Sequence, residues 1–298
     1  MAKQVGASLG DPLATAIASA AIAMDLYARG RFEEASLAFA TARHGYRQSG
    51  DLAPWGGVSA YLSLTLTLRG KLAESLAIGI ELETVGHAAQ DRRLEATGAH
   101  CVAGALLCGG ELQAGFLALE RSIARYRAIP DHHLVASALG DLAKWKLREG
   151  DTTAAAELVE EGKRIAREHQ LRGWLLTPLL AAEAGLLVAG VEAGSKDARA
   201  FDAAARVCRK LTAQARLHTE ALPPAKRALG ELEWRRGNAE RARAAWDESI
   251  AAARSIGAVI EELETHKMIA RHSVASSSRE AVEAIQRQLR AELRGAPV

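Results

Sequence analysis

Apolar residues recur along this chain with the spacing of an amphipathic helix, in blocks that repeat at a constant interval. Each block ends at a glycine, and these glycines are Gly30, Gly70, Gly110, Gly150 and Gly190. One apolar row lies eight residues before the glycine and consists of Ile22, Leu62, Val102 and Leu142. A second row lies four residues before it and consists of Leu26, Leu66 and Leu106. Because residues i and i+4 share a helix face, the two rows predict one buried stripe on a helix that ends at the glycine.

Each predicted helix also has a start signal, an aspartate that stands at a fixed distance before the glycine. The aspartates are Asp11, Asp51, Asp91 and Asp131. An aspartate accepts hydrogen bonds from the free N–H groups at a helix start, and a glycine adopts the left-handed conformation that ends a helix. A second amphipathic segment follows each glycine, with a small residue five positions on: Ala35, Ser75, Gly115 and Ala155. The repeating unit is therefore predicted to be helix A, a tight turn and helix B.

The repeat continues to the end of the chain with one irregularity after Gly190. The next turn glycine, Gly237, follows a longer spacing, and residues 222–256 restore the pattern. One helix pair buries too little apolar surface to offset the entropy of ordering its backbone, so the pairs must stack on one another. We predict an all-α solenoid of about seven antiparallel helix pairs as a single domain over residues 12–293, between tails at 1–11 and 294–298. The predicted pairs are 12–50, 51–90, 91–130, 131–170, 171–216, 217–256 and 257–293.

Several of these residues match a known repeat signature. Leu229, Gly230, Gly237, Ala242 and Trp246 resemble the tetratricopeptide-repeat pattern, and Gly30, Ala35 and Phe39 repeat its second half. The glycine-to-glycine period is longer than that of the usual tetratricopeptide repeat, and the family's early Trp, helix-A Tyr and closing Pro are mostly missing. In these differences the sequence resembles the long-helix variety of the family, which is found in the sensor arms of bacterial signal-transduction ATPases, maltose-activator-like regulators and adenylate cyclases. The resemblance implies a right-handed superhelix whose concave wall is built from helix A and binds a protein or peptide.

Helix-A positions that face away from the two apolar rows are the predicted binding residues. In the first three pairs they are mostly apolar: Met24, Tyr27, Leu64, Thr67, His100 and Leu107. In the fourth and sixth pairs they are mostly basic: Lys144, Leu147, Arg148, Arg227, Trp234 and Arg235. An apolar part beside a basic part suits an amphipathic or acidic peptide, with Trp234 and Tyr27 as anchors. Simple packing is the alternative, because a helix flanked on both sides is apolar nearly all round.

Composition and charge limit the classes of partner and the cellular compartment that we expect. The chain has 38 basic and 36 acidic residues, so its net charge of +2 gives no strong field for nucleic acid or an anionic membrane. Three cysteines without a C-x-x-C spacing are typical of a reducing compartment, so we expect a cytoplasmic protein. The most apolar stretch, 174–190, contains Pro178 and Glu183 and is shorter than a membrane-spanning helix.

Catalytic and metal-binding patterns are not found in the sequence. The stretch 190–196 approaches a phosphate-binding loop, but Ser195 separates Gly194 from Lys196 and no strand precedes it. The pair His132 and His133 has no third ligand of suitable spacing, and Cys101 has no base in the arrangement that a nucleophile needs. We therefore expect a non-enzymatic scaffold or sensor module with no cofactor, no metal and no catalytic residue.

Two alternatives stay open. The chain is, on the resemblance above, also similar to a regulatory arm of an ATPase or adenylate cyclase whose catalytic domain lies outside these residues. A weaker alternative is nucleic-acid binding through the segment 199–243, which has 11 basic and 5 acidic residues. This segment lacks interleaved aromatic residues and a helix-turn-helix pattern, so an acidic protein partner is the preferred interpretation.

Overall fold

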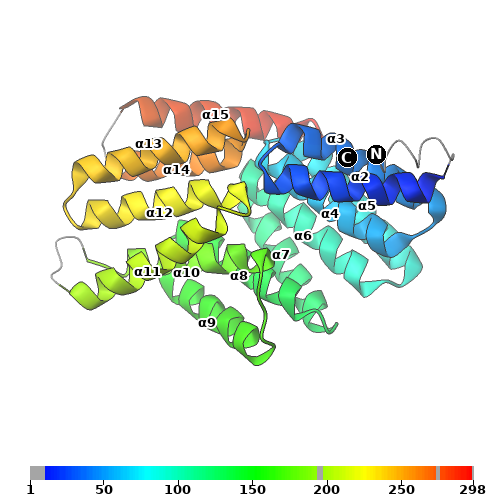
Figure 1. Ribbon diagram of the computed structural model, residues 1–298, viewed down its shortest axis with the longest axis horizontal. Coiled ribbons are helices and arrows are strands. Elements are labelled where there is room, and N and C mark those ends of the chain that lie inside the picture. The colour runs from blue at the N-terminus through cyan, green and yellow to red at the C-terminus, as the bar shows by residue number, and fades with distance from the viewer. Residues whose placement is uncertain (1–10, 193–196, 273–275, 297–298) are drawn as a thin grey trace. The chain divides into compact units, whose positions relative to one another are not determined.

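The computed structural model describes residues 11–192, 197–272 and 276–296. These residues form fourteen α-helices and two short 3-10 helices, and successive α-helices pack as antiparallel pairs (Figure 1). The predicted all-α fold of helix pairs is confirmed.

The first four pairs follow the period of the sequence closely. They are α2 (Pro12–Ala28) with α3 (Phe32–Ser49), α4 (Leu52–Leu68) with α5 (Leu72–Ala89), α6 (Arg92–Gly109) with α7 (Leu112–Arg127), and α8 (His132–Arg148) with α9 (Thr152–Glu168). In the next two pairs a 3-10 helix precedes helix A. These pairs are η1 (Trp174–Leu176) and α10 (Thr177–Ala189) with α11 (Ala198–Gln214), and η2 (Thr219–Ala221) and α12 (Leu222–Arg235) with α13 (Ala239–Ser255). The last pair is α14 (Val259–Arg271) with α15 (Ser276–Arg294).

The chain divides into two compact units, which are described separately. Unit 1 comprises residues 1–125 and 286–298, and unit 2 comprises residues 126–285. The single domain over residues 12–293 stays a prediction.

The turn glycines end the helices as predicted, with one exception. Gly30 has a φ of 74°, and the N–H of the following Arg31 donates to the carbonyl of Leu26 at 2.9 Å, which is the Schellman arrangement. The exception is Gly190, whose φ of −72° is right-handed because a longer insertion, and not a tight turn, follows α10. Gln90 and Gln170 adopt the left-handed conformation after α5 and α9, so the turn signal also follows helix B and is not always a glycine.

The aspartate caps are confirmed at three of the four predicted positions. Asp11, Asp91 and Asp131 each accept a hydrogen bond from a backbone N–H in the first turn of the helix. Asp51 makes no side-chain cap bond, so the start of α4 depends on its packing instead.

Small residues bring helices A and B close together. A Cβ atom added at Gly98 of α6 would lie 2.5 Å from the backbone nitrogen of Glu83 in α5, so only glycine fits there. In the preceding pair the hydroxyl groups of Ser63 and Ser75 hydrogen-bond at 2.8 Å. The predicted buried row holds at Leu62, Val102 and Leu142 but is wrong at Ile22, whose side chain is 41% exposed. Among the described residues α2 is the first helix, and none of them forms a preceding pair that covers this side of it.

Candidate functional site

Three of the predicted binding residues in the first three pairs are core residues. Tyr27 is only 2% exposed, and its ring stacks on Phe32 at 5.3 Å. Thr67 is buried and hydrogen-bonds to the hydroxyl of Ser75 at 2.7 Å, and buried Leu107 packs against Gly115. All three lie three residues before the turn glycine, and this position points at helix B of the same pair. The prediction that Tyr27, Thr67 and Leu107 contact a partner is therefore wrong.

The position six residues before the turn glycine is open instead. Leu64 is 40% exposed, and Met24, at the same position one repeat earlier, is half-buried. The equivalent residue of α6 is Gly104, where an added Cβ would meet no atom within 4 Å. We call Met24, Leu64 and Gly104 the open row. His100, also half-buried, lies one helical turn before Gly104 and gives this face a polar edge.

In unit 2, Arg148 is an ion-pair residue. Its Nε lies 2.9 Å from Oε2 of Glu264, which links α8 to α14. Its guanidinium also lies 4.2 Å from the centre of the Trp145 ring. Lys267 binds the same carboxylate at 3.0 Å. Burial alone would raise the pKa of Glu264, but the nearby cations, Arg148 foremost, lower it to about 2.

The other predicted basic residues of unit 2 are paired as well. Arg227 Nη1 lies 2.8 Å from Oε2 of Glu261, and Lys144 Nζ lies 2.7 Å from Oδ1 of Asp141. Leu147 packs against the core residues of α8, α9 and α10. The expectation of a mostly basic wall is therefore wrong here, because acidic residues neutralise its cations.

Trp234 and Arg235 belong to one packed cluster. The half-buried ring of Trp234 lies 5.8 Å from that of Trp246 and 4.8 Å from that of His272. Arg235 Nε lies 2.9 Å from Oε1 of Glu231, and its Nη1 donates to the carbonyl of Val191 at 2.6 Å. Arg235 thus holds Val191, close to the end of α10, in place. Trp234 is partly a packing residue and not the exposed anchor predicted.

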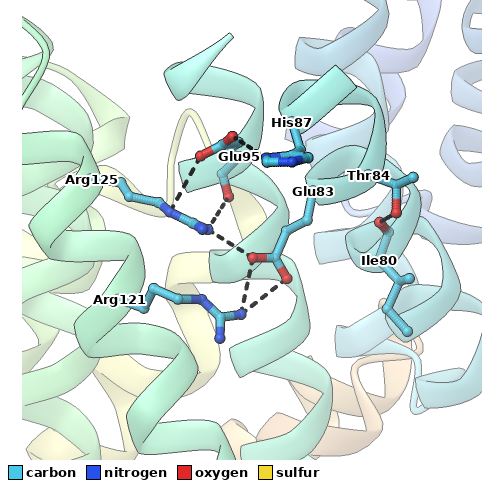
Figure 2. Close-up of a pocket in the computed structure, with 7 residues that line it drawn as sticks. All are labelled: Ile80, Glu83, Thr84, His87, Glu95, Arg121 and Arg125. Carbon is cyan, nitrogen blue, oxygen red and sulfur yellow. Dashed lines mark hydrogen bonds and ion pairs between the residues drawn. The ribbon is translucent and has the colours of Figure 1, made fainter. Parts of the chain in front are cut away.

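A surface pocket of about 410 Å³ lies in unit 1 between α5, α6 and α7. Figure 2 shows two guanidinium groups directed at one carboxylate: Arg121 Nη2 lies 3.0 Å from both oxygens of Glu83, and Arg125 Nη1 lies 2.8 Å from one of them. Arg125 also approaches Glu95, with 3.5 Å between Nε and Oε2.

The sequence analysis missed these four pocket residues, although a signal for them exists. Glu83 and Arg121 are 38 residues apart, which is close to one repeat, and Arg43 and Glu81 pair across the same separation. Opposite charges about one repeat apart therefore indicate ion pairs between successive B helices. Two carboxylates and two guanidinium groups neutralise each other here. The pocket is therefore best explained as a set of ion pairs that joins the second helix pair to the third.

Buried polar atoms lie at both 3-10 helices, with Thr177 directly after η1 and with His218 and Glu220 at η2. Nδ1 of His218 and Oε2 of Glu220 are buried without a hydrogen-bond partner among the described residues, and so is Oγ1 of Thr177. Burial raises the pKa of Glu220 to about 7 and lowers that of His218, whose ring stacks on Trp174 at 5.4 Å.

The cysteine thiols and His132 are packed against other residues of the fold. Burial raises the thiol pKa of both Cys101 and Cys208 to about 11, which makes them poor nucleophiles. His132 stacks on His169, the residue directly after α9. Within the described residues no group of three His, Cys, Asp or Glu side chains could hold a metal ion, and no helix there is long and apolar enough to cross a membrane. Residues 193–196 of the candidate phosphate-binding loop lie outside the described part.

The architecture thus defines an all-α helical-repeat protein built from sequential antiparallel pairs. No family model and no curated protein matches the sequence. The structure is similar to the crystal structure of a Rap protein complexed with competence and sporulation factor, with a TM-score of 0.66 over 94% of this chain and 76% of that chain. The identity is 13%, so the likeness establishes the fold. It supports the tetratricopeptide resemblance at the level of a helical repeat.

Proposed function

We propose that this protein is a non-enzymatic helical-repeat module of bacterial signalling that binds a protein or peptide on the helix-A face of unit 1. The observation that carries the proposal is the exposure of Leu64 between Met24 and the open surface at Gly104. Exposed apolar side chains that occupy equivalent positions of successive repeats form a surface suited to an extended apolar or amphipathic segment.

The comparison supports a binding role for this fold. The similar Rap protein was solved as a complex with competence and sporulation factor, so a chain of this architecture can hold such a factor. In the present chain Gly104 leaves the backbone of α6 accessible beside Leu64, where a partner side chain has room. His100 supplies a polar group at the edge of this face.

The chemistry of the described residues supports a role without catalysis. Glu83, Glu264 and Glu231 are each held by at least one arginine, and the thiols of Cys101 and Cys208 stay protonated near neutral pH. Turnover of nucleotide or ester substrates above the rate of a buffer blank would overturn this part of the proposal.

The binding site can be tested with ligands selected on the protein itself. A library of short random peptides displayed on phage is selected on the full chain, and the enriched peptides are labelled with fluorescein for anisotropy titration. Leu64→Glu is expected to weaken binding at least tenfold, because the contact then requires desolvation of a carboxylate.

Leu37→Glu is the matched control. Leu37 lies on helix B of the first pair and is 68% exposed, so the substitution makes the same chemical change outside the open row. It is expected to change the Kd less than twofold. Equal losses in the two variants, or failure of the library to enrich any peptide, would overturn the proposed site.

A further inference from the structure

The exposed face of α11 in unit 2 is strongly basic. Five cations lie on this helix and the turn that follows it: Arg199, Arg206, Arg209, Lys210 and Arg216. All five are exposed, and the face contains one acid, Asp202. Leu217, next in the chain, is 75% exposed, the highest value among the exposed large apolar residues of the described part.

These cations differ from the arginines of α8 and α12 because they are unpaired. In α8 and α12 the arginines Arg148, Arg227 and Arg235 each bind a glutamate. None of the five side chains on the basic face forms an ion pair or hydrogen bond with any described residue. Their charge is therefore available to an outside partner.

The opposite face of α11 fixes the helix to unit 2. Phe201, Ala204, Cys208 and Leu211 are buried in the core that α11 shares with α10 and α12. The guanidinium of Arg236 lies 5.1 Å from the centre of the Phe201 ring on the α12 side. Because its apolar face is already covered, α11 presents its basic face from a rigid support.

The spacing of the cations indicates the shape of the partner. Arg199 and Arg206 are seven residues apart, as are Arg209 and Arg216, so the charges repeat at the heptad interval at which two helices meet. From Arg199 to Arg216 the row spans about 26 Å, at about 1.5 Å per residue. We propose that α11 docks an acidic helix of a protein partner, with its carboxylates opposite these cations and an apolar side chain against Leu217.

Two other anionic partners fit the face less well. Single-stranded nucleic acid binds through a positively charged groove and stacked aromatic rings, whereas this face contains Asp202 and no aromatic residue of α11 is exposed on it. An anionic membrane binds an amphipathic helix through its apolar face, and that face of α11 is buried.

The test uses a designed acidic helix as the probe. A fluorescein-labelled, alanine-based peptide three heptads long carries glutamates at i, i+3, i+7, i+10 and i+14 and one terminal leucine. A second peptide has the same composition with its glutamates spread around the helix. A short single-stranded DNA and phosphatidylserine vesicles are titrated in parallel, each at about 50 and about 200 mM salt.

Arg206→Glu with Arg209→Glu is expected to weaken binding of the first peptide at least tenfold. The control, Arg241→Glu with Arg243→Glu, makes the same change of charge at exposed residues of α13 and is expected to alter the Kd less than twofold. Neutralising Arg206 and Arg209 to glutamine should give an intermediate loss. Leu64→Glu should leave this peptide bound, which distinguishes binding at α11 from binding at the open row.

Three results would overturn the proposal. One is equal affinity for the two peptides, which would show that charge alone and not heptad spacing matters. Another is tighter binding of DNA or vesicles than of the first peptide through Arg206 and Arg209. The third is the absence of saturable peptide binding at the lower salt concentration.

Discussion

Glu264 offers the sharpest test of how unit 2 is held together. Its carboxylate is buried and lies 2.9 Å from Arg148 and 3.0 Å from Lys267. These cations lower its pKa from 4.5 to about 2, and at about 1.4 kcal/mol per pKa unit the ionised carboxylate stabilises the fold by about 3 kcal/mol. Glu264→Gln is expected to lose this amount at pH 7.

The loss should depend on pH in a defined direction. A carboxyl group with a lowered pKa in the folded state stabilises the protein above its unfolded pKa of 4.5, and this stabilisation disappears as the pH falls toward 2. The difference between wild type and Glu264→Gln should therefore be about 3 kcal/mol at pH 7 and about half of that at pH 3.

Urea unfolding followed by tryptophan fluorescence measures this difference in the right part of the chain. Four of the five tryptophans, all except Trp55, lie in unit 2 with Glu264. Glu168→Gln is the control, because its ion pair with Arg164 is exposed on both sides and should contribute less than about 0.5 kcal/mol. Equal losses for both variants, or a loss at Glu264 that does not change with pH, would refute the reasoning.

Further outcomes follow from burial and close packing. Burial raises the pKa of Glu220 from 4.5 to about 7, so the fold loses stability as the pH rises from 4.5 to about 7. Glu220→Gln should therefore stabilise unit 2 by up to about 3 kcal/mol at pH 8 and by nothing at pH 4 in the same assay. Within α6, Gly104→Ala should raise the free energy of unfolding by about 0.5–1 kcal/mol because the space is open. Gly98→Ala should lower it by about 1–3 kcal/mol because α5 blocks the added atom. Thermal unfolding by circular dichroism should show opposite shifts of Tm for these two variants; shifts in the same direction would contradict the packing.

The helix pairs could be predicted from the sequence because their signals are local. An apolar stripe, a capping aspartate such as Asp91 and a left-handed glycine such as Gly30 act within one helix or turn. The same local rules failed at Gly190, where an insertion replaced the tight turn.

The candidate site was harder to predict because it depends on contacts between helices. Counting along helix A placed Arg148 and Arg227 on a basic wall, but their partners Glu264 and Glu261 lie on α14, far along the chain. Helical spacing also did not separate Tyr27, which points at helix B, from Leu64, which points outward. Which positions of helix A are covered depends on where helix B packs, and the spacing within helix A does not contain that information.

Photo-crosslinking tests the central claim, binding at the helix-A face, most directly. Benzoylphenylalanine is placed at position 64 or at position 37, and each protein is irradiated with a peptide selected on the wild type. The account predicts a crosslinked product from position 64 and at most a trace from position 37. A product that forms mainly from position 37 would contradict it.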